Sequence, residues 1–148
     1  HAGEKPWGLG ADKVDIMMPC ATQNDVNMDS AKKIAASGIK YYIEVANMPT
    51  TNDALEFLKE QKHMVVAPSK AVNAGGVSVS ELEMAQNAER LYWTAEEVDA
   101  KLKGIMKNIY HAADDAAKEY GHEGDLMLGA NAAGFVKVAN AMVAQGVL

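Results

Sequence analysis

Short apolar runs separated by stretches of helical periodicity fill the first part of the chain. Strands are predicted at Val14 to Met18, Ile39 to Val45 and Met64 to Ala67, because each run is short and mostly apolar, and the second carries tyrosines and isoleucines. Single helices are expected between the strands. Alternation of this kind predicts parallel pairing with right-handed crossovers.

Helix boundaries are marked by capping and stop residues. The first helix is expected to be capped by Asn27 or Asp29 and to end before Gly38. The second is expected to open at Pro49-Thr50-Thr51 and to run through Gln61. Both helices place small and branched apolar residues on one face, which predicts packing against the sheet.

The third strand leads into the stretch around which the rest is organised, Asn73 to Glu83. Gly75 and Gly76 are expected to turn the backbone, and Ser80 with Glu83 has the spacing of a capping box, so a helix is predicted to begin near Ser80. A strand, a glycine turn and a capped helix in this order bring backbone N–H groups and a hydroxyl together, which favours binding of an anion such as a carboxylate. The alternative interpretation is an ordinary strand–loop–helix junction without a ligand, because such a junction has the same residue spacing.

The second half is predicted to be helical. Thr94 and Glu97 form another capping box, and the helix that follows should reach Tyr120, before Gly121. Its apolar residues recur every three or four positions and predict one buried face. These residues are Val98, Leu102, Ile105, Ile109, Ala112, Ala116 and Tyr120.

A glycine-bearing loop, Gly121 to Gly129, is expected to lead to a last helix capped by Asn131 and stopped by Gly146. The 148 residues amount to one domain. We interpret 1–13 as a surface lead-in, 14–92 as alternating strands and helices, and 93–148 as a helical C-terminal segment. The fold class predicted is α/β: a partial Rossmann-like parallel sheet, the second half of a dinucleotide-binding domain, followed by long C-terminal helices.

Charge and composition narrow the classes of partner. A net charge of −6 without a basic block argues against nucleic acid. The single cysteine forms no internal disulfide, so we expect a reducing, cytoplasmic location. No apolar run is expected to reach the roughly 20 residues that a membrane helix needs, so no membrane partner is expected. The chain begins with His1, not Met, which favours a fragment or a processed protein.

Four blocks carry a family resemblance. They are PCATQND at residues 19–25, EVANMPTT at 44–51, NAGGVSVSELEMAQN at 73–87 and GANAAGFVKVANAM at 129–142. In this order and with similar spacing, they resemble the hexameric glutamate dehydrogenases over nearly the whole chain. The resemblance is to the C-terminal part of such an enzyme and not to a complete one.

The resemblance implies cofactor contacts at the strand ends. Asn47 and Asn73 match asparagines that hydrogen-bond the nicotinamide ribose, and an amide offers both donor and acceptor to ribose hydroxyls. Cys20 and Ala21 match positions whose backbone meets the nicotinamide. Taken alone, the asparagines are typical of loop residues that bond their own backbone, and Cys20 is typical of an inert small side chain.

Substrate contacts are implied on the following helix. Val77 and Ser80 match positions lining the glutamate pocket, where the serine pairs with a lysine of the other domain. No catalytic residue is expected in this chain, because the family's catalytic lysine and aspartate belong to the substrate domain. The sequence also holds no Gly-x-Gly-x-x-Gly loop. Val45, where many relatives carry glycine, favours the NAD-using clostridial-type branch, with NADP left open.

The implied parent reaction is the reversible oxidative deamination of L-glutamate to 2-oxoglutarate and ammonia, coupled to NAD. We expect the chain alone to be inactive and not necessarily to bind a cofactor. One alternative is a self-associating scaffold, a homo-oligomer that covers a sheet edge lacking its neighbour. Another is a free-standing nucleotide- or metabolite-binding module. No metal site is expected, since His111 and Asp115 share a helical face without a third ligand.

Overall fold

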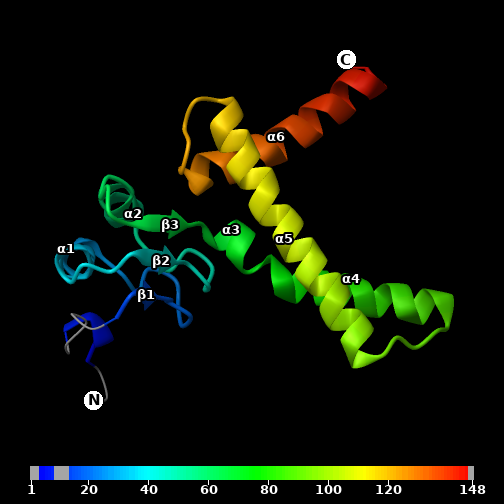
Figure 1. The fold of residues 1–148 in the computed structure, drawn as a ribbon, viewed down its shortest axis with the longest axis horizontal. Helices are drawn as coiled ribbons and strands as arrows, with labels where there is room; N and C mark the ends of the chain where they lie inside the picture. Colours follow the sequence, from blue (N-terminus) through cyan, green and yellow to red (C-terminus); the bar gives the residue numbers. More distant parts are fainter. Residues whose placement is uncertain (1–3, 9–13, 147–148) are drawn as a thin grey trace. The chain divides into compact units, whose positions relative to one another are not determined.

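The computed structural model of the chain describes residues 4–8 and 14–146 (Figure 1). They belong to two compact units, the first ending at Ser69 and the second beginning at Lys70. Most of the expected lead-in lies outside the described residues. Its described part includes a short 3-10 helix, η1 (Pro6–Gly8), and Trp7 within it is buried, contrary to the surface position expected.

A three-stranded parallel sheet forms the centre of the first unit. Strands β1 (Ile16–Met17), β2 (Tyr41–Ile43) and β3 (Val65–Ala67) lie in the order β1-β2-β3. Helix α1 (Met28–Ala36) connects the first pair and α2 (Asn52–Lys59) the second. The alternation and parallel pairing predicted from the sequence are confirmed, although each strand is shorter than its apolar run.

One face of this sheet is covered by the two helices. The buried core of the unit includes Ile34 of α1, Leu58 of α2, and Tyr42 and Val66, which are in register on neighbouring strands. Asn27 caps α1, since its side chain accepts a hydrogen bond from the Ser30 backbone N–H at 3.0 Å. The helix face predicted from residue spacing therefore meets the sheet as expected.

The opposite face carries a row of apolar side chains that the described residues leave open. Ile16, Tyr41 and Val65 are aligned across the three strands, and their exposed fractions are 52%, 44% and 41%. Adjacent residues of a strand point to opposite faces, so this row lies opposite the buried one. Parallel sheets are normally covered on both faces. The first unit thus supplies one of the two layers that such a sheet requires.

A buried hydroxyl pair links the sheet to the loop before α2. The Tyr42 hydroxyl lies 2.7 Å from Oγ1 of Thr50, and both residues are buried. Burial raises the pKa of Tyr42 well above its usual range, against the opposing effect of the hydrogen bond from Thr50. The phenol therefore stays neutral in the folded state at physiological pH.

Helices make up the second unit. Helix α3 (Ser69–Val72) precedes α4 (Ala74–Glu89), α5 (Ala95–Glu119) and α6 (Leu126–Gln145). Figure 1 shows α6, in orange and red, crossing α5, in yellow, and these two helices share the largest interface of the unit. The helical character predicted for the second half is confirmed.

Helix α5 begins and ends where the sequence predicts. The Thr94 Oγ1 accepts from the Glu97 backbone N–H at 3.2 Å, and Glu97 Oε2 accepts from the Thr94 N–H at 2.7 Å. Gly121 follows the helix with φ +76, a value that favours glycine. Just before the helix, Trp93 is half-buried, and the Lys101 ammonium lies 4.4 Å from its ring centroid.

The buried face predicted for α5 is only partly correct. Val98, Leu102, Ile105 and Ile109 are half-buried and Ala116 is buried. In contrast, Ala112 and Tyr120 are exposed. The side chains buried most deeply are those of Ala113, Ala116 and Ala117, because α6 packs against that end of the helix.

The start of α6 differs from the prediction. Asp125 caps it, accepting from the Leu128 N–H at 2.9 Å, whereas Asn131 lies inside the helix and Gly146 follows its end as predicted. Gly129 therefore belongs to the helix and not to a loop. A Cβ at Gly129 would lie 1.9 Å from the Ala113 carbonyl oxygen, so this glycine permits the close approach of the two helices.

Helix α6 differs from the expectation that no segment is long and apolar enough for a membrane helix. Its 20 residues are long and apolar enough to cross a membrane by length and composition alone, and few of them are buried. One such helix is weak evidence of a membrane span. Alanine and glycine make up eight of its 20 residues, and it carries Lys137 and two asparagines.

Candidate functional site

The loops that follow β1 and β2 run together at one end of the sheet. The backbone N–H groups of Val45 and Ala46 both donate to the Pro19 carbonyl, at 3.2 and 2.9 Å. Further along, the Asn24 N–H donates to Met48 O and the Val26 N–H to Pro49 O. These bonds bring the two predicted loop segments, 19–22 and 46–48, side by side at the carboxyl ends of their strands.

Three of the predicted cofactor contacts lie in these loops. Cys20, Ala21 and Asn47 are all exposed, at the edge where open parallel sheets bind ligands. The Cys20 thiol donates to the Met18 carbonyl at 3.2 Å. Amide and backbone groups of this kind can bind the hydroxyls and carboxamide of a ligand, and their contact with a nicotinamide stays a prediction.

The organising stretch is helical where a turn was predicted. Helix α4 begins at Ala74, and Asn73 is its N-cap residue, so Gly75 and Gly76 lie inside the helix. Ser80 also lies in its interior, and its hydroxyl donates to the Gly76 carbonyl at 3.3 Å. The capping box predicted for Ser80 and Glu83 is therefore wrong, as is the glycine turn.

Helix α4 lies against α5 at Gly75, whereas a Cβ built at Gly76 would meet nothing in the described part of the chain within 4 Å outside the helix. A Cβ at Gly75 would lie 3.7 Å from the Met106 sulfur and 3.8 Å from Leu102, both on α5. The helix is thus held through tertiary contacts that offset its low intrinsic propensity. The serine hydroxyl is satisfied by the carbonyl four residues before it, a common arrangement within helices.

The predicted substrate contacts share one face of α4. Val77 and Ser80 are three residues apart, and both are exposed, with Val77 61% exposed. Asn73 lies at the N-terminal end of the same helix, is half-buried, and does not cap it with its side chain. Asn73 and Asn47 belong to different units, so their convergence with Ser80 in one crevice stays a prediction.

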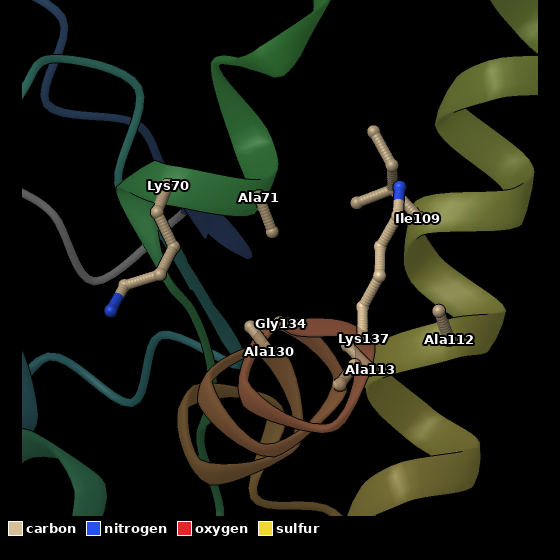
Figure 2. Close-up of a pocket in the computed structure, with 9 residues that line it drawn as sticks. Lys70, Ala71, Ile109, Ala112, Ala113, Ala130, Gly134 and Lys137 are labelled. Carbon is tan, nitrogen blue, oxygen red and sulfur yellow. The ribbon is translucent and has the colours of Figure 1, made fainter. Parts of the chain in front are cut away.

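A separate hollow of about 350 Å3 lies between α3, α5 and α6 in the second unit (Figure 2). Small and apolar residues form most of its wall, with Lys70 and Lys137 also lining it; they are Ala71, Ile109, Ala112, Ala113, Ala130, Ala133 and Gly134. The Lys70 ammonium donates to Asn131 Oδ1, and Figure 2 shows its side chain extending away from Ala71. The lining lacks the converging polar groups of a small-molecule site, and it includes no predicted site residue.

The face of α5 around His111 and Asp115, considered above as a possible metal site, includes an ion pair. Lys118 Nζ donates to Asp114 Oδ2 at 2.7 Å, and the His111 ring meets the edge of Tyr110 at a centroid distance of 5.5 Å. Across residues 4–8 and 14–146 there is no group of three or more His, Cys, Asp or Glu residues placed to hold a metal ion.

Glu44 is a residue of interest that the sequence reasoning missed. It follows β2, is only 2% exposed, and its Oε2 accepts from the Ser69 backbone N–H at 3.3 Å. Its Oε1 is buried and has no hydrogen-bond partner in the described part of the chain. An acidic residue between Ile43 and Val45 was the available signal, because strands rarely bury an unpaired carboxylate.

Comparison with known proteins agrees with the resemblance carried by the four blocks. The model of the glutamate/leucine/phenylalanine/valine dehydrogenase family matches residues 1–146. An NAD-specific glutamate dehydrogenase from Clostridium symbiosum is 64% identical over 98% of this chain, and an NADP-specific one from Escherichia coli (strain K12) is 53% identical over 99%. A solved glutamate dehydrogenase structure, 64% identical over 98% of this chain, matches with a TM-score of 0.93.

The matched region is a limited part of each relative. It covers 32% of the C. symbiosum protein, 32% of the E. coli protein and 32% of the solved chain. This chain therefore spans about a third of the length of the curated relatives it matches.

Proposed function

Because this chain belongs to the glutamate/leucine/phenylalanine/valine dehydrogenase family, we propose that it forms the nicotinamide side of the cleft in a glutamate dehydrogenase. The reaction proposed for the longer enzyme is the reversible oxidative deamination of L-glutamate to 2-oxoglutarate and ammonia. The observation that carries the proposal is the family match together with the exposed Cys20, Ala21 and Asn47 at neighbouring strand ends.

The residues of this chain would bind and orient, and not transfer protons. Asn47 and Asn73 hold the nicotinamide ribose through their side-chain amides, and the backbone at Cys20 and Ala21 meets the nicotinamide ring. Val77 and Ser80 line the glutamate pocket, with the serine hydroxyl directed at the side-chain carboxylate. The nicotinamide cofactor, when bound, supplies the hydride acceptor, so orientation is the protein's contribution from this side.

The cofactor proposed is NAD, with NADP as the alternative. Two similar glutamate dehydrogenases differ in this respect, the C. symbiosum protein being NAD-specific and the E. coli protein NADP-specific. The higher identity to the NAD-specific protein and the presence of Val45 favour NAD. We also propose a cytoplasmic location, on the basis of the single, unpaired cysteine.

The chain by itself is expected to be inactive towards glutamate and NAD. The proposed catalytic acid–base groups lie outside it, and their loss should lower turnover by roughly a thousandfold or more. The measurement compares NADH formation by the chain alone with that by the longer protein carrying it. Turnover of the two at similar rates would contradict the inactivity of the chain, and no turnover by the longer protein would contradict the proposed function.

A second proposal is that the chain self-associates as a homo-oligomer. The open row formed by Ile16, Tyr41 and Val65 supports it, because parallel sheets are normally covered on both faces. Light scattering over a dilution series is expected to give a mass above that of the 15.8 kDa monomer.

The variant Tyr41→Glu tests whether the open row makes that association. It should shift the scattering mass towards the monomer, since burying an unpaired carboxylate in an apolar interface is unfavourable. Tyr92→Glu is the matched control, because Tyr92 is 98% exposed and lies in the loop before α5. A monomer at all concentrations, or equal effects of the two variants, would count against the proposal.

A further inference from the structure

Met48 has a backbone conformation that is unfavourable for its residue type. Its φ is +47, in the left-handed region, where the Cβ of an ordinary side chain comes too close to the following carbonyl oxygen. It also precedes Pro49, and a proline ring further restricts the backbone of the residue before it. Glycine would adopt this conformation without that cost. A methionine here carries a backbone cost that its side chain has to offset.

The other residues with such a backbone have ordinary reasons for it. Among the described residues other than glycine, only Asn24 and Arg90 share a positive φ, with values of +56 and +57. Asparagine visits the left-handed region readily, because its short polar side chain can form a local hydrogen bond. Arg90 directly follows α4, and helices commonly end on a left-handed residue. Neither reason applies to Met48.

Hydrogen bonds to the neighbouring loop hold Met48 in this conformation. Its carbonyl accepts from the Asn24 N–H at 3.0 Å, and the next carbonyl, that of Pro49, accepts from the Val26 N–H at 2.9 Å. Val26 also pairs with Thr50 in an isolated parallel bridge. The loop after β2 is thus fixed to the loop after β1, and a left-handed residue other than glycine persists where its surroundings restrict it in this way.

The side chain of Met48 is 57% exposed, so burial in the core of the first unit does not offset the backbone cost. It follows Asn47 in the loop at the carboxyl end of β2, and the loop held beside it carries Cys20 and Ala21. All of these residues belong to the first unit. The thioether is therefore available to a ligand at the edge of the sheet where the predicted nicotinamide contacts lie.

We propose that Met48 is a cofactor-binding residue, whose side chain packs against the nicotinamide ring of NAD. This inference rests on the proposed function, which puts the nicotinamide at the loops after β1 and β2. The ring of NAD is aromatic, and a flexible, polarisable thioether makes favourable contact with an aromatic ring without needing a hydrogen-bond partner. Asn47 and the backbone at Cys20 and Ala21 then orient the cofactor, while Met48 supplies the apolar surface against the ring.

The test compares NAD with ADP-ribose, which keeps the adenosine, the diphosphate and the second ribose but lacks the nicotinamide ring. Titration calorimetry measures both dissociation constants in the longer protein that carries this chain. Met48→Gly is expected to weaken NAD binding about fivefold, the scale of a lost apolar contact between a thioether and a ring, and to leave ADP-ribose binding within about twofold. Met48→Leu keeps a similar apolar volume and should bind NAD within about twofold of the wild type.

Two controls separate this contact from a change in the fold. Glycine relieves the left-handed backbone at residue 48, so Met48→Gly should unfold thermally at no lower temperature than the wild type. Arg90→Gly makes the same backbone change after α4 and should leave the binding of both ligands unchanged. Met48→Ala shortens the side chain without freeing the backbone, and it gives the same comparison of ligands if Met48→Gly does not fold. Selective loss of NAD binding is a result that a merely structural role would not give.

Other outcomes overturn the proposal. Unchanged NAD binding in a folded Met48→Gly or Met48→Ala variant would show that the side chain makes no contact with the cofactor. Equal weakening of NAD and ADP-ribose would show that the nicotinamide ring is not what Met48 contacts. Equal weakening of NAD by Met48→Leu and Met48→Gly would show that apolar surface is not what matters. If the wild-type protein neither binds NAD nor oxidises glutamate, the proposed function fails, and no variant is needed to show it.

Discussion

Replacing Gly129 by alanine is expected to lower the free energy of unfolding by about 3 kcal/mol, the upper part of the range for overpacking a helix interface. The added Cβ would lie 1.9 Å from the carbonyl oxygen of Ala113 and 3.1 Å from the Cβ of Ala117. A backbone oxygen cannot rotate away, so α6 must shift relative to α5. Urea unfolding followed by far-ultraviolet circular dichroism measures the change.

Gly134→Ala is the matched control, on the same helix. Apart from its chain neighbours and the helix's own backbone, no atom of the described residues lies within 4 Å of a Cβ built at Gly134, and the residue is exposed. Alanine there should stabilise the helix by up to about 1 kcal/mol, because glycine is the poorer helix former. Opposite signs for the two substitutions are therefore expected. Stabilisation by both would show that α5 and α6 do not approach as closely as their backbones indicate.

Replacing Leu58 by alanine is expected to destabilise the first unit by about 2–5 kcal/mol, the usual range for emptying a buried leucine site. Leu58 is fully buried on α2, in the core that also contains Tyr42 and Ile34. The cavity left behind cannot fill from solvent, and the sheet limits how far the helix can move inwards. The same urea titration measures this loss, with the midpoint and slope fitted separately.

Leu91→Ala makes the same chemical change where the side chain is 58% exposed, in the loop that follows α4. Its effect should stay within about 0.5 kcal/mol, as is usual for surface substitutions. If Leu58→Ala is equally mild, the core of the first unit is not organised around α2 as the burial pattern indicates.

The sequence correctly predicted helix ends that are determined by residues close to them in the chain. The capping box at Thr94 and Glu97, and the glycine after Tyr120, placed α5 correctly because each acts through its own neighbours. Ser80 and Glu83 have the same spacing but lie in the middle of α4. The pattern alone does not distinguish a helix start from a helix interior, because that difference depends on what packs against the preceding turn.

The sequence did not predict where segments distant in the chain pack closely together. The sequence predicts turn or loop glycines at Gly75 and Gly129, yet both lie within helices beside α5. An added Cβ would lie 1.9 Å from the nearest atom of α5 at Gly129 but 3.7 Å from it at Gly75, so only Gly129 is needed for close approach. A glycine that allows close approach and a glycine that allows a positive φ have the same letter in a sequence. Only the position of the neighbouring helix separates the two uses.

The candidate site was predictable where it followed from strand topology. Parallel strands bring their carboxyl ends to one edge, so Cys20, Ala21 and Asn47 could be placed together before any coordinates were known. Glu44 was missed because its side chain accepts a hydrogen bond from the backbone N–H of Ser69, which is 25 residues away. Contacts across such separations are set by the register of the sheet, which a single sequence does not specify.

The two tryptophans of the chain fall one in each compact unit, Trp7 in the first and Trp93 in the second. Trp7 is buried, with the Lys5 ammonium 5.6 Å from its ring centroid, while Trp93 is half-buried with the Lys101 ammonium at 4.4 Å, so their indole emission should differ in wavelength. Variants retaining a single tryptophan would turn each ring into an optical reporter of its own unit. Melting of the sheet and melting of the helical bundle could then be followed as separate spectroscopic events in one polypeptide.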